Sequence, residues 1–140
     1  MQEFPDGYPD DLLELIGRSG GTFTALRVYR VAKYGVMDPK SYLSTFQEKQ
    51  CCQLRYPSQK KQDKSLSSYS TSCHIEKEKM QQYCLVSMRS CPQAIVIEGK
   101  TAPECGPSRL NPISGHVDWW LFKDARPWLY FHETEVDQNG

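Results

Sequence analysis

Residues 22–34 read TFTALRVYRVAKY and form the stretch that best defines the fold class of this chain. The segment is rich in β-branched and aromatic residues and is bounded by glycines, which is typical of a β-strand. Alternate side chains of a strand share a face, so Arg30 is expected to lie with Leu26 and Val28, and Arg27 on the opposite face. The predicted strand therefore carries an arginine on each face.

The rest of the chain shows further segments with a regular pattern. Helical spacing of apolar residues predicts a short helix after Asp10 and a second helix at residues 75–89. Strands are predicted at residues 69–73, 94–97, 117–122 and 128–136. Residues 47–68 are polar and residues 101–115 are rich in proline and glycine, so both are predicted to be irregular.

This order of elements favours an α+β fold, with two or three short helices and a mainly antiparallel β-sheet. The length of 140 residues suits a single domain over residues 1–140, with a polar loop or insertion at about residues 47–68.

The charge and hydropathy of the chain exclude several classes of protein. Its 17 basic and 17 acidic residues cancel, so it lacks the positive charge expected of a dedicated nucleic-acid binder or of a protein held on anionic lipid. No stretch has the roughly 18 to 20 consecutive apolar residues that span a bilayer. The acidic start MQEFPDGYPDD differs from a secretory signal. We therefore expect a cytoplasmic protein with neither a membrane nor a nucleic-acid partner.

The six cysteines carry little sign of a metal or redox site. Without a secretory signal, their expected state is the reduced thiol. No pair has the CxxC spacing of a zinc knuckle or a redox motif, so no metal is expected.

Three short motifs follow one another along the chain. They are the arginine strand LRVYRV at residues 26–31, Ser-Thr-Ser at residues 70–72 and Glu-x-Glu at residues 133–135. In this order they resemble the Arg, Ser-Thr-Ser, Glu-x-Glu pattern of the ADP-ribosyltransferase superfamily. The resemblance implies a split β-sheet that holds NAD, and transfer of ADP-ribose from NAD to an unidentified macromolecular acceptor such as a protein.

The resemblance also implies roles for the acidic residues. Glu135 would stabilise the oxocarbenium-like charge that forms when the nicotinamide bond breaks. Glu133 would orient or deprotonate the acceptor. Two carboxylates this close on one strand face repel each other, which raises the pKa of one and leaves the other ionised. Two other acids could take the catalytic place, namely Glu98 at the end of the AIVI strand and Asp118 in the segment HVDWW.

The remaining motif residues are expected to contact the cofactor. Arg30 or Arg27 would hold the phosphates or ribose of NAD, because guanidinium offers a planar fork of donors, and Arg30 is preferred because similar strands recur in the family. In the Ser-Thr-Ser motif of Ser70, Thr71 and Ser72, the two serines would hydrogen-bond the catalytic carboxylate and the ribose. Tyr69, next to the motif, would stack on nicotinamide. The simpler alternative is that this motif only caps the following helix.

An aromatic-rich segment at residues 119–131 supports a second hypothesis. Adjacent Trp119 and Trp120 on a strand point in opposite directions, so we expect one to enter the core and the other to line a groove or an interface. The chain would then be a non-enzymatic protein-binding module, either an inhibitor or an accessory factor, that presents this aromatic surface to a partner. The alternative for the same residues is a two-faced hairpin core.

Overall fold

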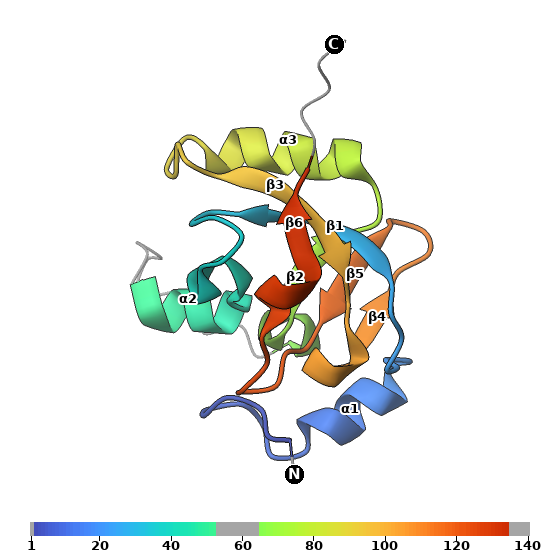
Figure 1. Ribbon diagram of the computed structural model, residues 1–140. Helices are drawn as coiled ribbons and strands as arrows, with labels where there is room; N and C mark the ends of the chain where they lie inside the picture. The colour runs from blue at the N-terminus through green and yellow to red at the C-terminus, as the bar shows by residue number, and fades with distance from the viewer. Residues whose placement is uncertain (1, 53–64, 135–140) are drawn as a thin grey trace.

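A computed structural model describes residues 2–52 and 65–134 of the chain. Its strands form one six-stranded antiparallel sheet in the order β4-β5-β2-β1-β3-β6 (Figure 1). They are β1 (Arg27–Ala32), β2 (Thr71–His74), β3 (Ile95–Lys100), β4 (Ser108–Leu110), β5 (His116–Trp119) and β6 (Phe131–Glu133). The predicted α+β class with a mainly antiparallel sheet is confirmed.

Three α-helices in the described residues surround this sheet. They are α1 (Leu12–Arg18), α2 (Thr45–Cys52) and α3 (Lys77–Ser87). In Figure 1, α3 lies beside β3 at the top, α2 lies at the left and α1 lies near the N-terminus. Short 3-10 helices form η1 (Pro39–Tyr42), η2 (Leu66–Tyr69), η3 (Pro103–Cys105) and η4 (Pro127–Tyr130). No helix in the described part of the chain has the length and apolar character needed to cross a membrane.

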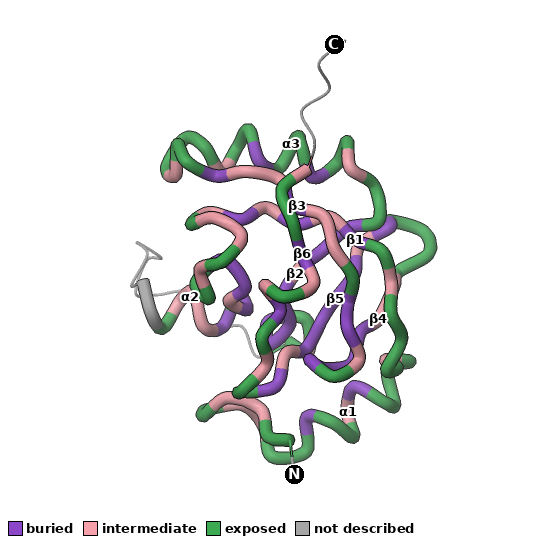
Figure 2. Tube along the Cα trace, in the orientation of Figure 1, coloured by how far each residue is buried: buried purple, intermediate pink, exposed green. Residues whose placement is uncertain are grey.

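The main core lies on one face of the sheet, where buried positions alternate along β1 as expected of a strand with one covered face (Figure 2). Strands from both halves of the sheet contribute, as do residues that follow β1 and β3. Its buried members are Val28, Ala32, Tyr42, Cys73, Ile97, Ala102, Cys105, Val117, Trp119 and Phe131.

A second, smaller core lies where α1 and η2 approach the end of β5. Its buried members are Leu12, Ile16, Phe46, Tyr69 and Trp120. Trp119 and Trp120 point in opposite directions, as predicted, but each enters a core and both are 0% exposed. Neither indole therefore lines an open groove.

The sheet is narrowly joined at its centre. Six residue pairs connect β1 with β3 and four connect β2 with β5, whereas β1 and β2 are paired only at Tyr29 and His74. Beyond that pair the side chain of Arg30 crosses to β2, where Nη1 donates to the carbonyl of Ser72. A guanidinium thus takes over a contact that backbone amides make elsewhere in the ladder.

The prediction of a loop at residues 47–68 is wrong at both ends of that range, where the structure has helical segments. Helix α2 occupies residues 45–52 and η2 occupies residues 66–69, while residues 53–64 lie outside the described residues. The missed signal is a capping box, because Ser44 Oγ accepts from the amide of Gln47 and Gln47 Oε1 accepts from the amide of Ser44.

Other predicted boundaries also change. The strand predicted at residues 22–34 is limited to β1. The strand predicted at residues 128–136 begins only at β6, because Pro127 begins the 3-10 helix η4, and its residues 135–136 lie outside the described residues. Residues 101–115 were expected to be irregular, yet they include β4, which pairs with β5. Such a short edge strand depends on its partner more than on its own composition.

Candidate functional site

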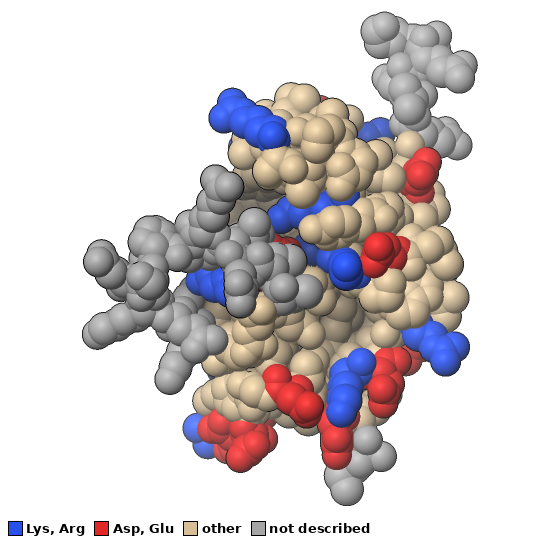
Figure 3. Space-filling view, turned by 90° about the vertical axis from the view of Figure 1, so that its left-hand side faces the viewer, with Lys and Arg blue, Asp and Glu red and all other residues tan. Residues whose placement is uncertain are grey.

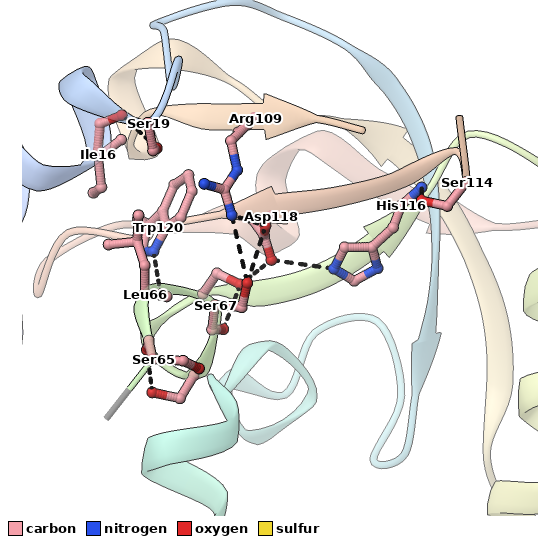
Figure 4. A network of polar contacts seen from close by, with 12 residues as sticks. Ile16, Ser19, Ser65, Leu66, Ser67, Arg109, Ser114, His116, Asp118 and Trp120 are labelled. Carbon is pink, nitrogen blue, oxygen red and sulfur yellow. Dashed lines mark hydrogen bonds and ion pairs between the residues drawn. The ribbon is translucent and has the colours of Figure 1, made fainter. Parts of the chain in front are cut away.

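The carboxylate of Asp118 on β5 lies at the centre of a polar network. Its Oδ1 accepts from Ser70 Oγ at 2.7 Å and from His116 Nε2 at 3.1 Å. Its Oδ2 accepts from Arg109 Nη2 at 2.8 Å and from Ser67 Oγ at 3.4 Å. Figure 4 shows the side chains of Ser67, Arg109 and His116 directed toward this carboxylate. Because an ionised carboxylate only accepts, His116 donates through Nε2.

The surroundings of Asp118 favour its charged form. The residue is only 4% exposed, and this burial alone would raise the pKa of its carboxyl group. Hydrogen bonds from His116, Arg109 and Ser70 outweigh the burial and lower the pKa of Asp118 below its usual value. The site therefore holds a buried carboxylate that stays ionised.

Strand pairing explains how distant parts of the sequence meet at this carboxylate. Asp118 lies opposite Ser72 of β2 on one side and opposite Arg109 of β4 on the other. Residues paired in this way project from the same face of the sheet, and so do residues two positions apart. His116 and Ser70 are two positions from Asp118 and Ser72, so both reach the same face.

A cavity of about 350 Å³ lies next to this network. Arg30, Ser72 and His116 line it from the sheet, together with Lys33 and Glu48, and its further lining residues are Val31, Met80, Tyr83 and Ser87. Its volume is at the lower end of the roughly 300 to 1,000 Å³ found for small-molecule sites. The cavity opens where β1 and β2 part. Figure 3 shows basic side chains near the middle of the face that it draws.

Arg30 is a structural part of this cavity wall. The residue is 7% exposed, and its guanidinium donates to the carbonyls of Ser41, Leu43 and Ser72. The bond from Nε to Ser41 is 2.8 Å long, whereas the bond from Nη2 to Leu43 is 3.3 Å long. Arg30 thereby ties the segment after β1 to the opening between β1 and β2.

The other predicted cofactor residues fall into two groups. Ser70 contacts a carboxylate, as expected of the motif, although the acid is Asp118, and Ser72 lines the cavity. Thr71 and Tyr69 instead support the fold. Thr71 Oγ1 donates to the carbonyl of Tyr42. Tyr69 is 5% exposed and packs in the second core, so its ring is not free to stack on nicotinamide.

Of the two predicted catalytic glutamates, the structure describes Glu133, which is not part of this network. Glu133 is exposed on β6, an edge strand separated from β2 by β1 and β3. Three strand spacings correspond to roughly 14 Å. Glu135 lies outside the described residues. Glu98, an alternative acid, forms an ion pair with exposed Arg27. Among the considered acids that the structure describes, Asp118 is the one that contacts the Ser-Thr-Ser motif.

The aromatic-rich segment also differs from the prediction of a binding surface. Trp119, Trp120, Phe122 and Phe131 are buried, and Trp128 and Tyr130 are half-buried. Leu129 is the exposed large apolar residue of the segment, and a group of such side chains lies on and just after α3, at Tyr83, Leu85, Val86 and Met88. The aromatic side chains of this segment are therefore mostly buried, but the predicted hairpin is wrong, because β5 pairs with β2 and β4 whereas β6 pairs with β3.

His116 and Arg109 are site residues that sequence reasoning missed. The alternation of His116 and Asp118 within a predicted strand could have shown that both side chains share a face. Nothing local to Arg109 predicts that it would lie opposite Asp118. No family model matches this sequence, and neither a curated protein nor a solved structure matches the chain. The function is therefore argued from the site alone.

Proposed function

We propose that this chain is an NAD-dependent ADP-ribosyltransferase that binds NAD in the cavity between β1 and β2 and uses Asp118 as its catalytic carboxylate. The observation that carries the proposal is the 2.7 Å hydrogen bond from Ser70 Oγ to Asp118 Oδ1. It joins the Ser-Thr-Ser motif to an ionised carboxylate beside a cavity that Arg30 and Ser72 both line. Two elements of the suspected pattern, Arg30 and Ser72, line this cavity, and the proposal gives Asp118 the role that the resemblance assigns to Glu135.

The chemistry of ADP-ribose transfer suits a carboxylate held in this way. Loss of nicotinamide leaves positive charge on the ribose, and a fixed negative charge nearby lowers the energy of that transition state. The hydrogen bonds that lower the pKa of Asp118 keep the charge in place at neutral pH. Ser70 holds the carboxylate in one orientation, which the stabilisation requires.

Arg109 controls access to the carboxylate in this proposal. Its guanidinium covers Asp118 Oδ2 at 2.8 Å and lies over the ring of Trp120, 5.2 Å from the centroid. Its side chain is 28% exposed, which leaves it room to turn away. The diphosphate of NAD offers a guanidinium another bidentate partner. Reaction at the ribose requires Arg109 to leave Oδ2.

The charges at the cavity wall suit a phosphate-containing ligand. Arg30 and Lys33 contribute two cations, and Glu48 contributes one carboxylate, whose oxygen lies 3.5 Å from Lys33 Nζ. Arg30 keeps its carbonyl contacts while its positive charge attracts the diphosphate.

The test compares NAD binding and nicotinamide release by the wild type and by Asp118→Asn. The variant keeps the size of the side chain and removes its charge. We expect it to bind NAD and to release nicotinamide about 100-fold or more slowly, the scale on which one electrostatic contact acts in catalysis. Arg30 is unsuitable for this test because the loss of its three backbone hydrogen bonds is expected to destabilise the fold.

Glu133→Gln and Glu98→Gln are the matched controls. Each removes one of the other acids considered from the sequence, and both are expected to leave nicotinamide release unchanged. Release by Asp118→Asn at the wild-type rate, or loss of release in Glu133→Gln alone, would contradict the assignment of Asp118. A wild type that neither binds nor consumes NAD at millimolar concentration would contradict the proposed function as a whole.

A further inference from the structure

His116 combines a contact to Asp118 with access to the cavity. Its Nε2 donates to Asp118 Oδ1 at 3.1 Å, and its side chain is 40% exposed and lines the cavity beside Ser72. Its Nδ1 has no hydrogen-bond partner among the residues that the structure describes. With the proton on Nε2, Nδ1 carries a lone pair. The ring is thus oriented by a carboxylate and has a basic nitrogen left for a ligand.

We propose that His116 is the general base of the reaction and that the acceptor it serves is a neutral hydroxyl group rather than a guanidinium. This inference rests on the proposed function, because it assigns the second substrate of the same site. A base must lie within hydrogen-bond reach of the proton that it removes, and its pairing with a carboxylate stabilises the imidazolium that results. Asp118 is the carboxylate that stabilises the imidazolium of His116. Because His116 lines the cavity, its ring can also come within hydrogen-bond reach of an acceptor bound there.

The charges around the ring disfavour a cationic acceptor. Arg109 lies on the far side of Asp118, and Arg30 and Lys33 contribute positive charge to the cavity wall. Glu48 is paired with Lys33, and Asp118 already accepts four hydrogen bonds. An arginine side chain would enter among like charges, whereas a hydroxyl group would meet no such repulsion.

The carboxylate of Glu133 lies too far from this site to bind a cationic acceptor there. The resemblance gave this residue the task of handling the acceptor, but it is exposed on the edge strand β6. In the sheet face that carries Asp118, the residue two positions before the acid is His116. The group next to the proposed catalytic carboxylate is therefore an imidazole, which can take a proton from a hydroxyl group.

The proposed step balances without an oxidant or a reductant. The bond between ribose C1′ and the nicotinamide nitrogen breaks, and its electron pair leaves with nicotinamide. The acceptor oxygen forms a bond to C1′ and gives its proton to His116 Nδ1, which releases it to solvent. With water as acceptor, NAD and water yield ADP-ribose, nicotinamide and a proton; with methanol, the sugar product is methyl ADP-ribose.

The test follows NAD turnover by the full chain in aqueous methanol, with and without added arginine. We expect the wild type to form ADP-ribose and methyl ADP-ribose and to form no arginine adduct. His116→Ala should lower kcat about 100-fold, the lower range for loss of a general base, with little change in the KM for NAD. Added imidazole should restore part of the lost kcat, which a merely structural role of His116 would not allow.

His116→Gln and His132→Ala complete the design. His116→Gln keeps a donor for Asp118 without a basic nitrogen, so a folded variant with the wild-type kcat would overturn the inference even if His116→Ala failed to fold. His132 is an exposed histidine on β6, and its replacement should leave kcat unchanged. An arginine adduct as the main product would also overturn the inference while leaving NAD-dependent transfer intact. A wild type that does not bind NAD would end both proposals.

Discussion

Replacement of Arg30 by alanine should cost a large part of the stability of this protein. The guanidinium is buried and donates to three backbone carbonyls, and two of these bonds, to Ser41 and Ser72, are short. A hydrogen bond from a charged group contributes about 1.5 to 3 kcal/mol, so loss of the two short bonds should cost about 3 to 6 kcal/mol. Domains of this size have a free energy of unfolding of about 5 to 15 kcal/mol. The Arg30→Ala variant is therefore expected to be marginally folded.

Urea denaturation followed by tryptophan fluorescence measures this loss, because Trp119 lies in the main core. Arg30→Lys keeps the charge but not the planar fork, so its midpoint should fall between those of the wild type and Arg30→Ala. Arg27→Ala, three residues earlier on the other face of β1, removes an exposed arginine and should leave the midpoint near that of the wild type. An Arg30→Ala variant that lost less than about 1 kcal/mol would refute the view that Arg30 joins β1 to β2.

The structure makes three further predictions about stability and reactivity. Burial opposes the charge of Asp118, but hydrogen bonds lower the pKa of its carboxyl group overall. Its contribution to the free energy of unfolding is therefore present above pH 3.8 and is lost as the pH falls through the lowered pKa. Acid titration of Asp118→Asn should not show this loss of stability. Burial raises the pKa of the Cys73 thiol to about 12 and that of Cys105 to about 11. Mass spectrometry after alkylation of the native protein at pH 8 should find both unmodified, and rapid labelling of either would show that the core opens. Gly106→Ala should lower the urea midpoint, because φ is +149° and a Cβ would collide with the carbonyl of Trp120; an unchanged midpoint would contradict that packing.

Local patterns predicted most of the elements of the fold. Strand β1 could be predicted because every second residue faces the core. Helix α3 could be predicted because its apolar residues follow helical spacing. Helix α2 was missed because its composition is polar, although Ser44 and Gln47 carry the capping signal. Strand β4 was missed because three residues hold too little pattern to separate a strand from a loop.

The candidate site was less predictable because it depends on pairing between distant strands. Ser70 and Arg30 could be selected from their motifs, and the structure brings both to the same region. Asp118 could be considered only as one acid among several, because no local feature states that β5 pairs with β2. The burial of Tyr69 could not be predicted either, because its ring packs against Tyr8 and Phe46, which are distant in the sequence.

The most direct test of the account is to locate NAD on the protein by NMR. Backbone amide resonances of the ¹⁵N-labelled full chain would be followed as NAD is added to millimolar concentration. We predict saturable shifts at the cavity, for the amides of Val31, Ser72, Tyr83 and His116, with Glu133 on β6 unaffected. The absence of any saturable shift, or shifts centred on β6 with none at the cavity, would contradict the claim that NAD binds between β1 and β2.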